Sequence, residues 1–198
     1  MAEKVKEVID ALKLEKINLL GHSLGGYVSL AFAEKFPEIL ESMTLFFSTT
    51  VADDEEKKQI RRRSIAVIDE NFETFVKTSI PNLFSNNEKD ILEGKIELAK
   101  NTAKSTHKEG VKAAQLGMAE RPDRTEILEN LDAKILIIAG KYDNAVKTEN
   151  LLKIIPEKTN IKTYVLDCGH NGHWEKPTIC AEIINTELFH NLPKHFLL

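Results

Sequence analysis

The stretch INLLGHSLGG, residues 17–26, decides the fold of this chain of 198 residues. Its first four residues are an apolar run that predicts a buried strand, and a helix is predicted from Leu24 to Phe36, where Pro37 ends it. Small residues on both sides of Ser23 allow the sharp, strained turn that must join strand and helix. A serine in a Gly-x-Ser-x-Gly turn with this setting is predicted to be a nucleophile. The alternative is that Ser23 only caps the helix.

Two later strands end at residues that could assist this serine. An apolar run over residues 134–139 is followed by a turn that ends at Asp143. A second run, Ile161–Leu166, is followed by a loop that ends at His170. Because the carboxyl ends of parallel strands meet at one edge of a sheet, we expect the three side chains to lie together as nucleophile, base and orienting acid. Asp167 is the alternative acid, and its closeness to His170 in sequence places it poorly.

Apolar strands alternate with helices at both ends of the chain. This alternation predicts an α/β fold with a mostly parallel sheet flanked by helices. Between residues 51 and 121 helical patterns follow one another with no convincing strand. We therefore expect a discontinuous core formed by residues 1–50 and 122–198, with a helical lid at residues 51–121 inserted into it.

Composition and charge narrow the classes of partner. The formal net charge of −4 gives no reason to expect nucleic acid, and no apolar run reaches the roughly 20 residues of a membrane span. The basic block at residues 57–63 directly follows the acidic block 53–56, which predicts a solvated helix with compensating charges. Cys168 and Cys180 make no disulfide framework, so we expect reduced thiols in a cytoplasmic protein.

Three motifs together resemble the α/β-hydrolase family, and more narrowly its lidded, esterase-like branch. They are GHSLGG at residues 21–26, the turn from Gly140 to Asp143, and GHNGHWEKP at residues 169–177. In the last motif the histidine, the acid five positions on and the proline that opens the final helix all match. The resemblance covers the chain from residue 3 to about residue 190.

The resemblance implies a role for each motif residue. Ser23 attacks an acyl carbonyl, His170 takes and returns its proton, and Asp143 holds the imidazole. The backbone N–H of Leu24 supplies one donor of the oxyanion hole. No cofactor and no metal are expected, and the expected partner is a small-molecule acyl substrate.

By the same resemblance we expect an N-terminally shortened family member, because the chain begins in the helix before the strand at residues 17–20. A loop after an earlier strand normally gives the second oxyanion donor, and losing one such donor costs about 10²–10³ in kcat. The strand from Ile17 to Leu20 would then be an exposed apolar sheet edge. We expect this edge to pair two copies as a homodimer or to receive strands from a separate polypeptide, unless the sequence is a truncated product.

The leading hypothesis is a serine hydrolase that cleaves a carboxylic ester or related acyl compound through a Ser-His-Asp triad and an acyl-enzyme. Cleavage of thioesters, lactones or carbon–carbon bonds remains open. The alternative is a non-catalytic or weakly active relative that serves as a binding or assembly module, since half of its oxyanion hole is missing. Among nearby residues, His22 is expected to point away from the site and His173 to pack. Glu175 is expected to support the first turn of the final helix.

Overall fold

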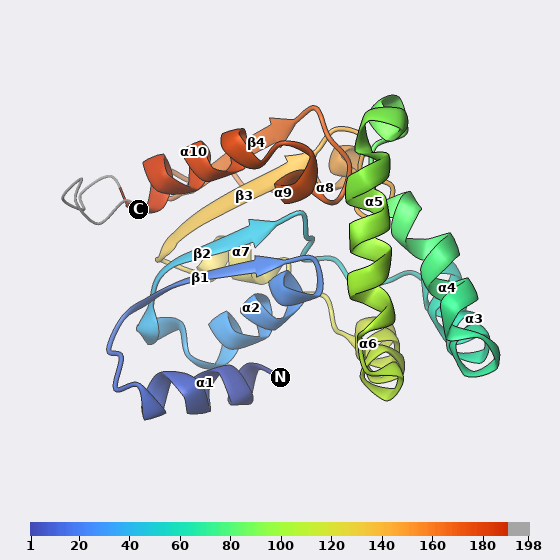
Figure 1. Cartoon of the computed structure of the whole chain (residues 1–198). Helices are drawn as coiled ribbons and strands as arrows, with labels where there is room; N and C mark the ends of the chain where they lie inside the picture. Colours follow the sequence, from blue (N-terminus) through green and yellow to red (C-terminus); the bar gives the residue numbers. More distant parts are fainter. Residues whose placement is uncertain (190–198) are drawn as a thin grey trace.

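The structure is a computed structural model that describes residues 1–189, so residues 190–198 of the predicted core lie outside it. The sharp turn after the first strand leads directly into the second helix (Figure 1). In chain order the elements are α1 (Ala2–Ala11), β1 (Ile17–His22), α2 (Leu24–Lys35), the 3-10 turn η1 (Pro37–Ile39), β2 (Leu40–Phe46), α3 (Glu55–Glu70), α4 (Phe72–Ser79), η2 (Ile80–Leu83), η3 (Asn86–Glu88), α5 (Lys89–Lys104), α6 (Lys108–Glu120), α7 (Glu126–Asn130), β3 (Lys134–Gly140), α8 (Thr148–Leu152), β4 (Ile161–Leu166), α9 (Gly172–Glu175) and α10 (Pro177–Leu188).

The four strands form one parallel sheet in the order β1-β2-β3-β4. One row of residues crosses all of them, from Leu20 through Thr44 and Leu136 to Lys162. Parallel pairing brings the carboxyl ends of the strands to the same edge, where the loops after β1, β3 and β4 begin. The predicted α/β fold with a parallel sheet is confirmed.

Alternate residues of β3 serve the two faces of the sheet, as the period of a strand requires. Ile135 and Ile137 join an apolar cluster with α1, α2 and α7 on one face. Leu136 and Ile138 join a second cluster with α10 on the other face. Both pairs are fully buried, so β3 has no polar face. This is why β3 is the strongest apolar run in the sequence.

Helices α3 to α6 lie between β2 and β3 in the chain and stand beyond the carboxyl ends of the strands (Figure 1). A small apolar cluster around Phe84, Leu92 and Ile96 includes Trp174, so this helical segment packs against the chain that follows β4. The segment contains no strand, in line with the helical pattern of the sequence. Its division from the core at residues 51 and 121 remains a prediction.

Strand β1 forms one edge of the sheet among the described residues. Leu20 on this strand is 39% exposed, which is unusual for a large apolar side chain in a parallel sheet. Pairing of this edge with a second copy or with another polypeptide remains a prediction. No helix within residues 1–189 is both long and apolar enough to span a membrane.

Candidate active site

Ser23 sits in a strained turn between β1 and α2. Its backbone has φ 51° and ψ −113°, a conformation that L-residues rarely adopt. The Ser23 N–H donates to the carbonyl of Phe46 at 3.0 Å, which ties the turn to the end of β2. The Ser23 side chain makes no capping bond to α2, so the capping role considered from the sequence is not observed.

Two glycines near Ser23 are required by space. A Cβ on Gly21 would lie 2.3 Å from the backbone of Gly25, and one on Gly26 would lie 2.3 Å from the Ser48 hydroxyl. Gly25 itself has nothing within 4 Å of an added Cβ. The expectation of small residues two positions before and after Ser23 therefore holds for Gly21. It is wrong for Gly25, where an added Cβ would meet no other atom. Gly26 is a further position where an added Cβ would clash.

The structure brings the three predicted side chains into one hydrogen-bonded chain. Ser23 Oγ lies 2.7 Å from His170 Nε2, and His170 Nδ1 lies 2.8 Å from Asp143 Oδ2. His170 is 2% exposed and Asp143 is 5% exposed. Water is thus largely excluded from the His170–Asp143 pair, which strengthens their interaction. In this arrangement the serine can give its proton to Nε2, while the Asp143 carboxylate accepts a hydrogen bond from Nδ1–H and stabilises the imidazolium that forms.

The second oxygen of Asp143 is held by the backbone. Oδ1 accepts hydrogen bonds from the N–H groups of Ala145 and Val146, at 2.7 and 2.8 Å. Oδ1 therefore fixes the carboxylate to the loop, and Oδ2 is left to bind His170. Asp167, the alternative acid, is exposed and pairs with Lys141 at 3.3 Å.

Leu24 is the first residue of α2, directly after Ser23. The first N–H groups of a helix have no partner within the helix, and they lie at the positive end of its dipole. The Leu24 N–H thus lies next to Ser23 at the positive end of the helix dipole. Its role there remains a prediction.

His22 does not point away from the site, and the expectation that it does is wrong. Its Nε2 lies 3.1 Å from the carbonyl oxygen of His170, and the two rings lie 5.3 Å apart between centroids. The ring of His173 packs against His22 at 4.6 Å, as the packing role predicted for His173 requires. Nothing in the sequence signals this contact, because His22 and His170 are 148 residues apart.

Acid should weaken the fold through His22. Burial lowers the pKa of His22 from 6.5 to about 4. Between these two values the unfolded chain binds more protons at this residue than the folded chain does, so stability falls as the pH falls. The free energy of unfolding should drop by up to about 1.4 kcal/mol for each pH unit within this window.

The variant His22→Gln isolates this contribution, because a glutamine can donate to the His170 carbonyl but does not titrate. Denaturant unfolding of both proteins at the two ends of the window should show the smaller loss for the variant. An equal loss in both proteins would show that His22 does not carry the effect.

Glu175 ties the histidine loop to the helical segment. Its carboxylate accepts from the Gly169 N–H at 3.0 Å and from the Ser85 N–H at 3.2 Å. The prediction that Glu175 supports the first turn of the final helix is therefore wrong. Its carboxylate oxygens accept instead from the N–H of Gly169, the residue before His170, and from the N–H of Ser85. Burial raises the pKa of Glu175 above its usual range.

Comparison with known proteins agrees with the fold. A family model described as the alpha/beta hydrolase fold matches residues 1–177. The putative 2-succinyl-6-hydroxy-2,4-cyclohexadiene-1-carboxylate synthase of Bacillus subtilis (strain 168) is 27% identical over 190 residues, which cover 90% of this chain and 68% of that protein. The 2-hydroxy-6-oxononadienedioate/2-hydroxy-6-oxononatrienedioate hydrolase of Escherichia coli (strain K12) is 27% identical over 182 residues, covering 88% of this chain and 62% of that protein.

Among solved structures, a thermophilic esterase from Thermogutta terrifontis is similar with a TM-score of 0.84 and 32% identity. The match covers 93% of this chain and 69% of the esterase. This chain spans roughly two thirds of the length of these relatives, at 62% to 69%. The family model, the identity to the esterase and the parallel sheet agree, and the chain belongs to the α/β-hydrolase fold family.

Proposed function

We propose that the chain is a serine hydrolase that cleaves a carboxylic ester or a related acyl compound. The observation that carries the proposal is the hydrogen-bonded chain from Ser23 through His170 to Asp143. Each member lies at the carboxyl end of a different parallel strand, where α/β folds build their sites. The names of the relatives support the reaction class, since they include an esterase and a hydrolase.

The proposed reaction has two acyl-transfer steps. Ser23 Oγ attacks the acyl carbon while its proton passes to His170 Nε2, and the Leu24 N–H donates to the oxyanion that forms. The imidazolium then gives this proton to the leaving alkoxide, and the acyl-enzyme remains on Ser23. In the second step His170 takes a proton from water, the hydroxide attacks the acyl carbon, and the proton returns to Ser23 as the acid leaves. Asp143 stabilises the imidazolium in both steps.

The helical segment is proposed to be the lid over this site. An apolar cavity of about 280 Å³ lies between α2 and α6 and is bordered by Leu24, Tyr27 and Gly117. Leu24 follows the proposed nucleophile, so this cavity is proposed to take the acyl part of the substrate, although Ser23, Asp143 and His170 do not themselves line it. A panel of p-nitrophenyl esters of increasing chain length measures how long an acyl group the site accepts.

Labelling with a fluorophosphonate tests the nucleophile directly. The folded protein should bind one probe per chain, at Ser23, and the Ser23→Ala variant should bind none, because only an activated serine attacks the phosphorus rapidly. The matched control is Ser105→Ala on the exposed end of α5, which should label like the parent protein. Peptide mapping by mass spectrometry identifies the modified residue.

The second candidate function is a binding or assembly module that keeps the three side chains without turnover. A folded protein that takes up no probe would favour this candidate and overturn the proposal. Labelling that persists in Ser23→Ala would overturn the assignment of the nucleophile.

A further inference from the structure

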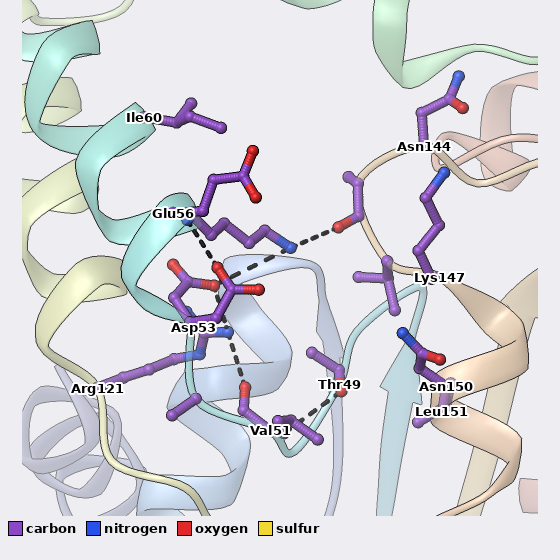
Figure 2. A pocket seen from close by; sticks show the side chains of 15 residues that line it. Thr49, Val51, Asp53, Glu56, Ile60, Arg121, Asn144, Lys147, Asn150 and Leu151 are labelled. Carbon is purple, nitrogen blue, oxygen red and sulfur yellow. Dashed lines mark hydrogen bonds and ion pairs between the residues drawn. The ribbon is translucent and has the colours of Figure 1, made fainter.

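A cavity of about 370 Å³ separates the first turn of α3 from the loop that follows Asp143 (Figure 2). Asp53, Glu56 and Lys57 line it on the side of α3. Residues 144–147 line it on the side of the loop. The helical segment and the proposed catalytic acid thus approach each other across a partly open space.

Lys57 crosses this space. Its Nζ donates to the carbonyl oxygen of Ala145 at 2.7 Å. Lys57 is half-buried, and burial lowers the pKa of its ammonium. The prediction that the block at residues 57–63 belongs to a solvated helix is therefore wrong at Lys57, and also at Arg61, whose side chain is 14% exposed.

The acceptor of this hydrogen bond belongs to the loop that orients Asp143. The N–H groups of Ala145 and Val146 hold Asp143 Oδ1, and this leaves Oδ2 directed at His170. A shift of Ala145 would move the acceptor oxygen of the triad with it. Positioning errors of about 1 Å can cost up to 10²-fold in rate.

The Lys57 ammonium also faces a buried carboxylate. The same Lys57 Nζ that donates to Ala145 lies 4.0 Å from Asp53 Oδ1, and the Asp53 side chain is fully buried. Asp53 also accepts from Arg61 and from Arg121, the latter at 2.9 Å. Burial alone would raise the pKa of Asp53, but the two guanidinium groups hold it below its usual value. The ionised Asp53 carboxylate therefore attracts the Lys57 ammonium, while the two guanidinium groups that share this carboxylate repel it.

Arg121 extends these contacts to the core. Its guanidinium carbon lies 4.0 Å from the centre of the Tyr27 ring on α2, the helix that begins after Ser23. The contacts thus connect helix α2, the first turn of α3 and the loop that follows Asp143. Every link is a charge-assisted hydrogen bond, an ion pair or a cation–π contact, each of which is directional or short-ranged.

We propose that Lys57 is a positioning residue that couples the helical segment to the orientation of Asp143 through the Ala145 carbonyl. The inference rests on the proposed function for its effect on rate. Its effect on the His170–Asp143 hydrogen bond does not depend on turnover, so the two can be tested apart.

The test compares Lys57→Met with Lys57→Arg. Methionine matches the side chain as far as Cε and has a similar helix preference, but it removes the donor. Asp53 keeps both arginine partners, so the variant should fold. With p-nitrophenyl acetate, kcat should fall by about 10- to 100-fold in Lys57→Met with little change in KM, and Lys57→Arg should recover most of it. Lys58→Met is the matched control, because Lys58 pairs only with Glu55 among the described residues.

Proton NMR gives the readout that does not need turnover. The proton between His170 Nδ1 and Asp143 gives a downfield resonance, which should shift or broaden by exchange in Lys57→Met and remain in Lys58→Met and Lys57→Arg. A parent-like resonance in folded Lys57→Met would overturn the inference, whatever the activity. If the parent protein shows the resonance but no hydrolysis, the proposed function fails and the coupling is still measured by the resonance.

Discussion

Replacing Asp143 with Asn should lower kcat about 10⁴-fold, the size of loss that the same change causes in serine proteases, while the fold stays intact. The structure gives the reason. Oδ1 of Asp143 accepts from two backbone N–H groups, so an asparagine must keep its oxygen there. Its NH₂ group then faces His170 Nδ1, which must accept instead of donating. The imidazole is left with its proton on Nε2 and cannot accept the proton of Ser23.

Hydrolysis of p-nitrophenyl esters measures this loss, and thermal unfolding shows whether the fold is kept. The KM should change little, because Asp143 does not touch the substrate in the proposed reaction. The matched control is Asp167→Asn, which removes an exposed carboxylate near the same histidine and should leave kcat unchanged. A tenfold loss or less in Asp143→Asn would mean that another group orients His170.

The sequence is sufficient to predict Ser23, His170 and Asp143 as a group, because each follows a strand that is recognisable by itself. The run before Asp143 is β3, whose side chains are buried on both faces, and the run before His170 is β4. In a parallel sheet, knowing where strands end places the residues that follow them. The short apolar run at residues 43–47 also predicts a strand, and it corresponds to β2, although β2 begins earlier, at Leu40.

The short helices α7 and α9 are not predicted, because five and four residues are too few to show a helical period. The contacts of His22, Glu175 and Lys57 also cannot be predicted from the sequence. Each joins atoms of elements that are far apart in the chain, such as Lys57 and Ala145, which are 88 residues apart. Local pattern gives the charge and period of a helix but not the surface that it meets, so the basic block was expected to be solvated throughout.

Replacing Glu175 with Met should destabilise the fold by about 2–6 kcal/mol, since the buried N–H groups of Gly169 and Ser85 lose their acceptor at about 1–3 kcal/mol each. Methionine fills a similar volume, so the loss reports the missing acceptor more than a cavity. In a chain of this size each kcal/mol lowers Tm by about 2–4 °C. Thermal unfolding measures the shift, and Glu182→Gln on the exposed face of α10 is the control that should not change Tm.

Glu175→Gln separates the charge of this carboxylate from its role as acceptor. The pKa of Glu175 is raised in the fold, mainly by burial, so the folded chain holds this proton more tightly than the unfolded chain. The stability that this gives is present below the usual pKa of 4.5 and is lost as the pH rises through the raised value. The parent should therefore lose stability relative to Glu175→Gln as the pH rises across that window. A difference that stays constant with pH would mean that the carboxylate is ionised as easily in the fold as in water. The Gly169 and Ser85 hydrogen bonds would then fully offset the cost of burying its charge.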